Sequence, residues 1–289
     1  MKTQVKYRIW IISDLQQSAP EKTREFMQQV INDFKEINLK CDRIFCLGDT
    51  SAGDKMEDLK EMSLIQKELL ASLDIPLRFV LGNHELDVYR NKKNKERIVP
   101  FYETVKQTPG WKTTKKIEDF YFKEELGDYN FIFLSDHSSE NGSWFSTHGK
   151  VFGNKEEYPY SEQDFKNLSK QIKKDAKPTI TLSHYSFAGG GRPSNLLNKM
   201  LPLPDNVCIH FHGHLHIGDK YHGQEKYLQK ISYIDYQDIP QINAASLENV
   251  RGNAMRSVFL EIYEDNSLGV YFREHDNKRW VESYGKKVD

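Results

Sequence analysis

Short apolar runs alternate with longer amphipathic stretches through the first half of the chain. The runs at 9–12, 43–47 and 77–81 are largely β-branched, leucine or aromatic and end in polar or glycine turns, which is typical of buried strands. Between them, apolar residues at 21–38 and 56–73 recur at steps of three and four, which predicts helices with one apolar face. This order predicts right-handed βαβ units in a largely parallel sheet.

The second half of the chain is predicted to contain more strands. Apolar runs at 120–122 and 130–134 flank a Gly-Asp turn at 127–128, which predicts a hairpin. Ser161 and Asp164 have the spacing of a helix-capping signal and predict the start of a helix. Further strands are expected at 179–182, 207–211, 241–245, 257–263 and 268–273.

Composition and charge exclude several classes of protein. The chain has 289 residues, with 41 Lys+Arg against 42 Asp+Glu, so a generally basic nucleic-acid coat is excluded and no nucleic-acid partner is expected. No run approaches the roughly 18 consecutive apolar residues of a membrane helix, so no membrane partner is expected. The run at 9–12 is too short for the core of a signal peptide. In the absence of repeats and linkers, residues 1–289 are expected to form one domain.

Cysteine usage indicates the compartment. The three cysteines, Cys41, Cys46 and Cys208, are an odd number, and two of them lie beside or inside apolar runs. Such residues are typical of reduced core thiols rather than of a disulfide framework. We therefore expect a cytoplasmic protein.

Potential metal ligands occur where the predicted strands end: Asp14, Asp49, Asn83, His84, His184, His214 and His216. In open α/β sheets this carboxyl edge is where ligands bind. Carboxylate, amide and imidazole groups together suit Mn, Fe or Zn better than Ca. The set is too large for one ion with an open position, but it suffices for two ions if one carboxylate bridges them. Gly48, Gly82 and Gly213 are expected to permit the backbone turns that aim the following ligand.

These residues form sequence blocks whose order is informative. Gly-Asp at 48–49, Gly-Asn-His-Glu at 82–85, a lone His184 and Gly-His-Leu-His at 213–216 resemble the signature blocks of the calcineurin-like metallophosphoesterases. The resemblance extends from residue 9 to about residue 216, and the C-terminal strands fit the family's second sheet. It implies an α/β fold, a four-layer α/β-β/α sandwich of two mixed sheets flanked by helices.

The resemblance also implies a role for each residue at a two-metal centre. The implied ligands are Asp14 and His216 for the first metal, Asp49 for both, and Asn83, His184 and His214 for the second. His84 is implied to be catalytic and to face the substrate, as a general acid for the leaving oxygen or as an electrostatic clamp on the phosphate. An imidazole suits that role because it exchanges protons near neutral pH.

The first block departs from the family pattern. The family has Asp-x-His where this chain has Asp14-Leu15-Gln16. Either the Gln16 amide oxygen binds the first metal or water takes that place, and we favour ligation by Gln16. An amide oxygen is a weaker donor toward Zn or Fe than an imidazole and suits Mn or Mg. We therefore expect two divalent metal ions, Mn before Fe, Zn or Mg, with the first ion the more exchangeable.

Other candidate residues have no expected role in the chemistry. His210 and His212 would share a strand face with His214 and His216, but Gly213 is expected to break that register, which leaves the first two structural. Loop or solvated positions are expected for His137, Arg192 and residues 92–97. Those left unassigned are His148, His222 and His275, and those left open between substrate wall and core are Phe101, Tyr102, Trp111 and Trp144.

The expected reaction is hydrolysis of a phosphoester by a water molecule activated between two metal ions. The family's protein phosphatases carry an arginine soon after the second-block Asp, whereas residues 50–53 here are Thr-Ser-Ala-Gly, which disfavours a phosphoprotein substrate. The family's nucleases have long additions and basic surfaces, and this chain shows neither. We expect a small phosphodiester, a nucleotide or another phosphorylated metabolite, with phosphodiesterase favoured over monoesterase.

A scaffold protein that keeps the fold but is catalytically weak or inactive, and acts in protein interaction, is the alternative. Gln16 could be a first loss of a ligand in that direction. Against this alternative, a pure scaffold has no physical reason to keep the remaining donors His84, Asn83, His184, His214 and His216.

Overall fold

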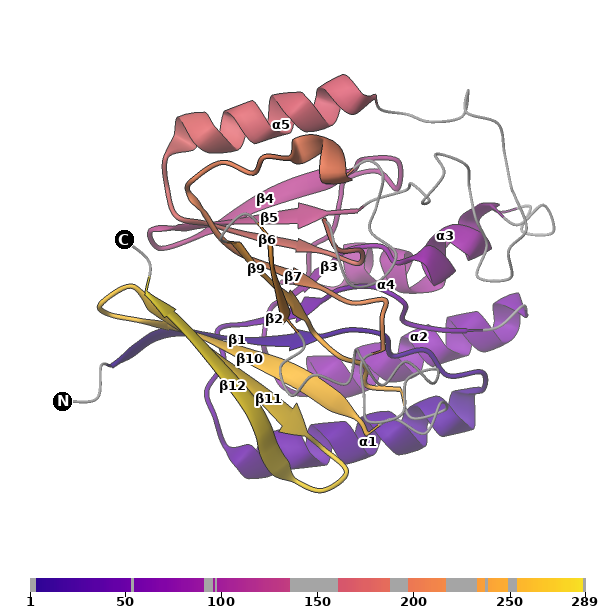
Figure 1. Ribbon diagram of the computed structural model, residues 1–289. Helices are drawn as coiled ribbons and strands as arrows, with labels where there is room; N and C mark the ends of the chain where they lie inside the picture. The colour runs from indigo at the N-terminus through magenta and orange to yellow at the C-terminus, as the bar shows by residue number, and fades with distance from the viewer. Residues whose placement is uncertain are drawn as a thin grey trace.

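Two sheets face each other, with helices on their outer sides (Figure 1). The computed structural model describes residues 4–52, 55–90, 96, 98–135, 161–187, 197–216, 233–236, 239–248 and 254–287. In Figure 1, α1 (Pro20–Ile37) and α2 (Met56–Ala71) lie below the sheets, and α5 (Glu162–Asp175) lies above them. The two sheets have six strands each.

The first sheet joins elements from both ends of the chain, in the order β12 (Arg279–Lys287), β11 (Ser267–Glu274), β10 (Arg256–Tyr263), β1 (Val5–Ile12), β2 (Arg43–Cys46) and β3 (Leu77–Phe79). β1, β2 and β3 pair in parallel, which confirms the predicted βαβ arrangement. β10, β11 and β12 extend this first sheet by antiparallel pairing from β1, so the expectation that the C-terminal strands fit the second sheet was wrong for them. The sequence did not predict β12, because this edge strand is largely polar.

The second sheet has the order β4 (Tyr121–Leu126), β5 (Tyr129–Leu134), β6 (Thr179–Ser183), β7 (Val207–His212), β9 (Ile239–Asn243) and β8 (Tyr233–Tyr236). β4 and β5 form the predicted hairpin, and β5, β6, β7 and β9 pair in parallel. α5 begins at the predicted capping signal, where the N–H and the hydroxyl of Ser161 donate to the Asp164 carboxylate at 2.6 and 2.8 Å. β8, the short edge strand, was not predicted.

Two short helices, α3 (Asn83–Arg90) and α4 (Pro100–Gln107), follow β3 and were not predicted. α4 places Phe101 and Tyr102 in the core, where each is 2% exposed. Trp111 is partly buried and packs against the same cluster. These three aromatic residues therefore belong to the core rather than to a substrate wall, and Trp144 lies outside the described residues.

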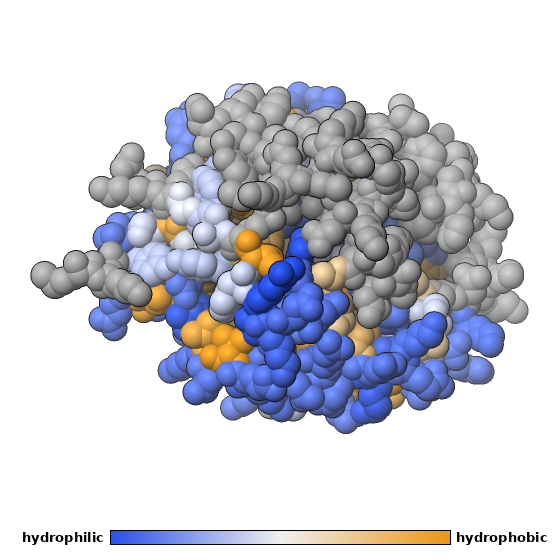
Figure 2. All heavy atoms as spheres, turned by 60° about the horizontal axis from the view of Figure 1, so that its bottom comes forward, coloured by the Kyte–Doolittle hydropathy of each residue, from blue (hydrophilic) through white to orange (hydrophobic). Residues whose placement is uncertain are grey.

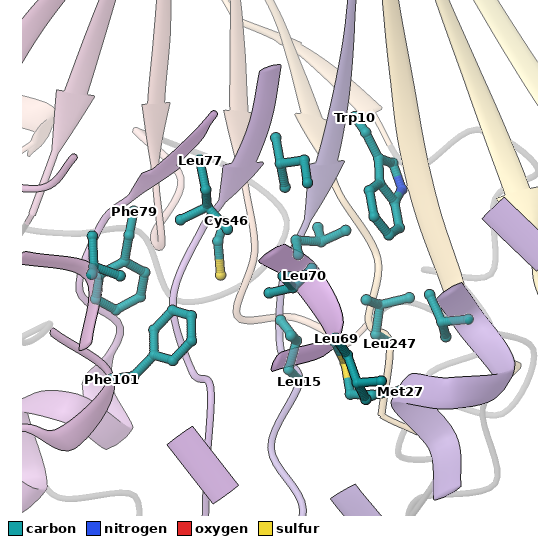
Figure 3. Close-up of a cluster of buried hydrophobic side chains, with 14 of the residues drawn as sticks. Trp10, Leu15, Met27, Cys46, Leu69, Leu70, Leu77, Phe79, Phe101 and Leu247 are labelled. Carbon is teal, nitrogen blue, oxygen red and sulfur yellow. The ribbon is translucent and has the colours of Figure 1, made fainter. Parts of the chain in front are cut away.

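Apolar side chains fill three layers. Figure 3 shows the first layer, in which Trp10, Cys46 and Leu77 of the first sheet lie near Leu69 and Leu70 of α2. The second layer lies between the two sheets, and the third packs α5 against the second sheet. The order is therefore helices, sheet, sheet, helix, which confirms the expected four-layer α/β-β/α sandwich of two mixed sheets.

The cysteines are core residues. Cys41, Cys46 and Cys208 are buried, and each is a free thiol. Burial raises the pKa of the Cys41 thiol to about 12, so this group stays protonated and unreactive near neutral pH.

Figure 2 shows one face of the molecule. Among the described residues on this face, hydrophilic side chains predominate, and hydrophobic ones lie in separate groups. Among the described residues, the large hydrophobic side chains that are exposed are Leu64 and Trp280. Single exposed residues of this kind are ordinary on a globular surface. No helix in the described part of the chain has the length and apolar character to cross a membrane.

Candidate metal centre

The loops that follow β1, β2, β6 and β7 contact one another at one edge of the sandwich. The Asp14 N–H donates to the carbonyl oxygen of Gly48 at 3.0 Å, which joins the loops after β1 and β2. The Gly213 N–H donates to the carbonyl oxygen of His184 at 3.1 Å, which joins the loops after β6 and β7. The two sheets are connected here because the His214 N–H donates to Asp14 Oδ2 at 3.0 Å.

Asp14, Gln16 and His216 form a first group of buried side chains. Asp14 Oδ1 lies 3.1 Å from His216 Nε2, and the Gln16 amide lies 3.2 Å from the same nitrogen. The Gln16 amide is satisfied at both ends when its NH₂ donates to the carbonyl oxygen of Asp49 at 3.1 Å and its oxygen faces His216 Nε2. In that orientation the amide oxygen and the Asp14 carboxylate lie against the same imidazole nitrogen.

Asp49, Asn83, His184 and His214 form a second group. His184 Nε2 lies 3.2 Å from Asp49 Oδ2 and 3.1 Å from Asn83 Oδ1. The rings of His184 and His214 are 5.1 Å apart between centroids. One ligand atom each from Asp49, His184 and His214 lie within 4.8 Å of one another, and Asp49 is within the same distance of the carboxylate and imidazole of the first group. Asp49 is therefore common to both groups.

Hydrogen bonds determine which nitrogen each imidazole presents. His184 Nδ1 lies 2.7 Å from the carbonyl oxygen of Leu47, and His216 Nδ1 lies 2.8 Å from Glu248 Oε1. Because both partners are acceptors, each Nδ1 carries a proton, and Nε2 is the ring nitrogen that each imidazole turns toward the site. Asp14 Oδ1, although buried, accepts no hydrogen bond from the described residues. Carboxylate oxygens and imidazole nitrogens thus converge within 4.8 Å of one another, and this donor chemistry fits bound metal ions.

Burial and neighbouring charges shift the pKa values of the carboxylates and imidazoles of the site. Burial opposes ionisation of Asp14, but His216 and His184 hold the pKa of that carboxyl below its ordinary value. Burial also opposes protonation of His184, but the Asp49 carboxylate raises the pKa of its imidazole to about 9. Burial lowers the pKa of His214 to about 3, so its ring is neutral. The site thus combines an ionised carboxylate with a neutral imidazole that is free to act as a ligand.

Four of the candidate ligands have left-handed backbone, which the sequence did not predict. The φ angle is 53° at Asp14, 54° at Asp49, 70° at His214 and 46° at His216. Non-glycine residues adopt this region uncommonly, and such positions cluster at functional sites. Each turns the chain sharply just after a strand ends.

The glycines differ in part from the expectation. Gly48 has a φ of 94° and makes the expected turn. Gly82 and Gly213 lie outside the left-handed region, so their backbone angles do not explain why glycine is needed there. Instead, a Cβ at Gly82 would lie 2.2 Å from Asp49 Oδ1, and one at Gly213 would lie 1.9 Å from Ser13 Oγ. These two glycines are required for the close approach of neighbouring loops.

His84 lies on the exposed side of the site. Its side chain is 17% exposed, whereas that of Asp49 is 1% exposed. Its Nε2 lies 3.9 Å from Asp49 Oδ2 and 3.5 Å from the Gln16 amide. The His84 N–H donates to Asp49 Oδ1 at 2.9 Å, so the backbone of His84 is tied to the shared carboxylate.

Glu85 is a structural residue of the site that the sequence analysis did not assign. Its Oε2 accepts the N–H groups of Asp49 at 2.9 Å and of Gly82 at 2.8 Å. Its Oε1 accepts the N–H and the hydroxyl of Thr50, both at 2.7 Å. Burial and the charge of Asp49 raise the pKa of Glu85, and these donors oppose that rise. Because Glu85 belongs to the Gly-Asn-His-Glu block, the sequence motif could have indicated a role for it.

Glu248, which contacts His216, was also missed, and no motif in the sequence points to it. His210 and His212 bond to groups other than the candidate ligands. His210 is buried and bonded to Thr181 Oγ1 at 3.0 Å, and His212, at the end of β7, is bonded to the Gly213 carbonyl oxygen at 3.1 Å. Several residues that the sequence analysis considered lie outside the described residues, namely His137, His148, His222, Arg192, residues 92–95 and Arg97.

Comparison with known proteins agrees with the fold. The family model of the calcineurin-like phosphoesterases matches residues 7–218, and the chain belongs to this family. A dimetal phosphatase from Danio rerio aligns over 99% of this chain and 100% of its own, with a TM-score of 0.63 and 11% identity. A comparison with curated proteins returns no match.

Two further solved structures share the fold. A purple acid phosphatase from yellow lupin (Lupinus luteus) seeds aligns over 100% of this chain and 55% of its own length, with a TM-score of 0.57 and 14% identity. A protein of Thermus thermophilus aligns over 97% of this chain and 99% of its own length, with a TM-score of 0.52 and 11% identity. The chain is thus a metallophosphoesterase in fold and family, and it contains two buried Asp/His groups that could hold metal ions.

Proposed function

We propose that the chain hydrolyses a small phosphodiester at a centre of two divalent cations, with nucleotides and other small phosphorylated metabolites as the wider substrate class. The observation that carries this proposal is that two groups of potential ligands share one carboxylate, Asp49. The proposed holders of the cations are Asp14, Gln16 and His216 for the first, Asn83, His184 and His214 for the second, and Asp49 for both.

Two divalent cations held in this position would supply Lewis-acid charge to phosphoryl oxygens and would lower the pKa of a bound water molecule toward neutral pH. The residues of the chain orient the substrate and move protons. His84 is the proposed general acid, because it is a partly exposed imidazole outside the two groups of candidate ligands and its Nε2 lies 3.9 Å from Asp49 Oδ2. Proton transfer by a positioned side chain contributes about 10²–10⁴-fold to rate.

The charge of the site supports a diester over a monoester. The described arginine side chains pair with carboxylates elsewhere: Arg8 with Glu261, Arg24 with Glu68, Arg43 and Arg78 with Glu124, Arg256 and Arg279 with Glu274, and Arg273 with Asp33. A phosphomonoester dianion carries more negative charge than a diester and gains more from an arginine. Thr50, which follows the shared carboxylate, is engaged with Glu85 instead. Mn²⁺ is the cation proposed first, because carboxylate and amide oxygens suit it.

The test is hydrolysis of bis-p-nitrophenyl phosphate and p-nitrophenyl phosphate by the purified chain in Mn²⁺. We expect the diester to be the better substrate. Asp49→Asn should abolish activity on both, and His84→Ala should lower kcat by about 10²–10⁴-fold without lowering metal content. Asp128→Asn is the matched control, because Asp128 is a surface carboxylate paired with Lys6.

Each outcome of that assay has a defined meaning. A chain that binds two cations but hydrolyses neither ester in Mn²⁺, Fe²⁺, Zn²⁺ or Mg²⁺ would support the non-catalytic scaffold instead. A faster rate with the monoester would overturn the diester preference and leave the phosphoesterase intact. Unchanged kcat in His84→Ala would remove His84 from the proposed proton transfer.

A further inference from the structure

Glu248 is a buried carboxylate that contacts a proposed metal ligand through the ring nitrogen opposite the site. Its Oε1 lies 2.8 Å from His216 Nδ1, and the residue is 0% exposed. Removing an ionised carboxylate from water is unfavourable unless the carboxylate is paired and hydrogen-bonded. Its burial directly behind His216 therefore indicates a role at the site.

The segment that carries Glu248 is fixed to the loop that carries Asp14. The Glu248 N–H and the Ser246 hydroxyl both donate to the Asp14 carbonyl oxygen, at 3.0 and 3.1 Å. The Leu247 N–H donates to the Ser13 carbonyl oxygen at 3.1 Å. These bonds hold the Glu248 segment and the Asp14 loop together, with the His216 ring between the two carboxylates.

His216 of the first group and His184 of the second differ in the acceptor that their Nδ1–H contacts. His216 donates its Nδ1–H to the side-chain carboxylate of Glu248, whereas His184 in the second group donates its Nδ1–H to the backbone carbonyl of Leu47. An anionic partner fixes the tautomer and raises the donor strength of the other ring nitrogen. His216 Nε2, which lies 3.1 Å from Asp14 Oδ1, is therefore the strengthened donor.

We propose that Glu248 is a positioning residue that raises the affinity of the first group for its cation. It acts through His216 and offsets the weak amide donor that Gln16 brings to the same group. This inference rests on the proposed function, which requires two bound cations. It predicts that loss of Glu248 weakens the first cation selectively and leaves the second in place.

The test is binding of Mn²⁺ alone to the metal-free full-length chain, measured by calorimetry and by electron paramagnetic resonance of the bound ion. Glu248→Gln keeps an oxygen that accepts the Nδ1–H but removes the charge, and Glu248→Ala removes both. Glu124→Gln is the control, because Glu124 is a partly buried carboxylate that pairs with Arg43 at the start of β2. Circular dichroism confirms that each variant is folded.

We expect the first-cation affinity to fall by about 10–100-fold in Glu248→Ala and by less in Glu248→Gln, with the second affinity unchanged. At two equivalents of Mn²⁺, the spin-coupled signal of the wild-type pair should give way to a mononuclear signal in Glu248→Ala. If that variant does not fold, the Glu248→Gln titration decides alone.

Two results would overturn the inference, and they are distinguishable. If the wild-type chain binds two Mn²⁺ and the Glu248 variants bind both with unchanged affinity, or lose both equally, Glu248 has no selective role and the proposed function stands. If the wild-type chain binds fewer than two Mn²⁺, the proposed two-cation function fails and the inference fails with it.

Discussion

Glu85 Oε2 lies 2.9 Å from the backbone nitrogen of Asp49 and accepts its N–H. The same oxygen accepts the Gly82 N–H at 2.8 Å, so one carboxylate joins the loop after β2 to the loop after β3. The shared carboxylate of the two groups is therefore held in place through its own backbone. This relationship gives the last residue of the Gly-Asn-His-Glu block a structural role beside the candidate ligands.

Replacement of Glu85 by Gln is expected to damage the site through its backbone. The new NH₂ group cannot accept a hydrogen bond, so either the Asp49 and Gly82 N–H groups or the two donors of Thr50 lose their acceptor. Two buried unsatisfied groups should lower the free energy of unfolding by about 2–4 kcal/mol. Urea denaturation measures this loss. Glu68→Gln on the exposed face of α2 is the control, and an equal effect of both changes would contradict the role of Glu85.

Gly213→Ala should impair the first group of ligands. The added Cβ would lie 1.9 Å from Ser13 Oγ and 2.7 Å from Asp14 Oδ2, so these side chains or the His214 loop must move. We expect a loss of about 1–3 kcal/mol of stability from overpacking, together with weaker binding of one cation. Gly285→Ala is the matched control, because its nearest contact is ordinary, 3.7 Å from the carbonyl oxygen of Leu268. Calorimetry with Mn²⁺ checks the result, and normal binding by Gly213→Ala would contradict it.

Gln16→His should strengthen binding of the first cation, most of all for Zn²⁺, because an imidazole nitrogen is a better donor to Zn²⁺ than an amide oxygen. We expect a gain of about tenfold, equivalent to about 1.4 kcal/mol. Gln16→Leu, which has no donor, should weaken binding instead. Titration of the three proteins with Zn²⁺ gives the order. If all three bind equally, Gln16 is not a ligand and water takes its place.

Acid stability should depend on Asp33, which lies in the core away from the site. Arg273 donates to Asp33 Oδ1 at 2.6 Å, and His275 Nδ1 lies 2.7 Å from Oδ2. Burial opposes its ionisation, but these partners lower the pKa of Asp33 from 3.8 to about 2. Because the pKa is lower in the folded state, the stabilisation is present above pH 3.8 and is lost as the pH falls through about 2.

The pKa difference corresponds to about 2 kcal/mol at neutral pH. Asp33→Asn leaves Arg273 and His275 without their anion and should cost about 3–5 kcal/mol at pH 7. Urea midpoints measured from pH 7 to pH 2.5 should show the difference between wild type and variant shrinking as the pH falls. A difference that stays constant across this range would contradict the assignment.

The sequence predicted those elements whose pattern comes from burial. The strand cores at 9–12 and 179–182 are completely buried in the structure, and their apolar runs reflect this. β12 and β8 are edge strands, and α3 and α4 are short, so none of them has a long apolar pattern. That residues 1–289 form one domain stays a prediction.

The sequence also predicted which side chains meet, because motif residues at the ends of parallel strands share one edge. It could not predict how they are held. The left-handed backbone at Asp14 and Asp49 depends on contacts between distant loops. Glu248 reaches His216 from a separate segment with no motif, so only the three-dimensional arrangement reveals it. The roles proposed for the individual site residues, including Gln16 as a ligand and His84 as the general acid, await the experiments above.

Anomalous diffraction from crystals of the full chain grown with Mn²⁺ tests the central claim most directly. The account predicts two manganese peaks, about 3.5–4 Å apart, with the Asp49 carboxylate between them. The Gln16 amide should contact one peak and His184 the other. A single peak, or peaks that do not lie beside Asp49, would contradict the two-cation centre.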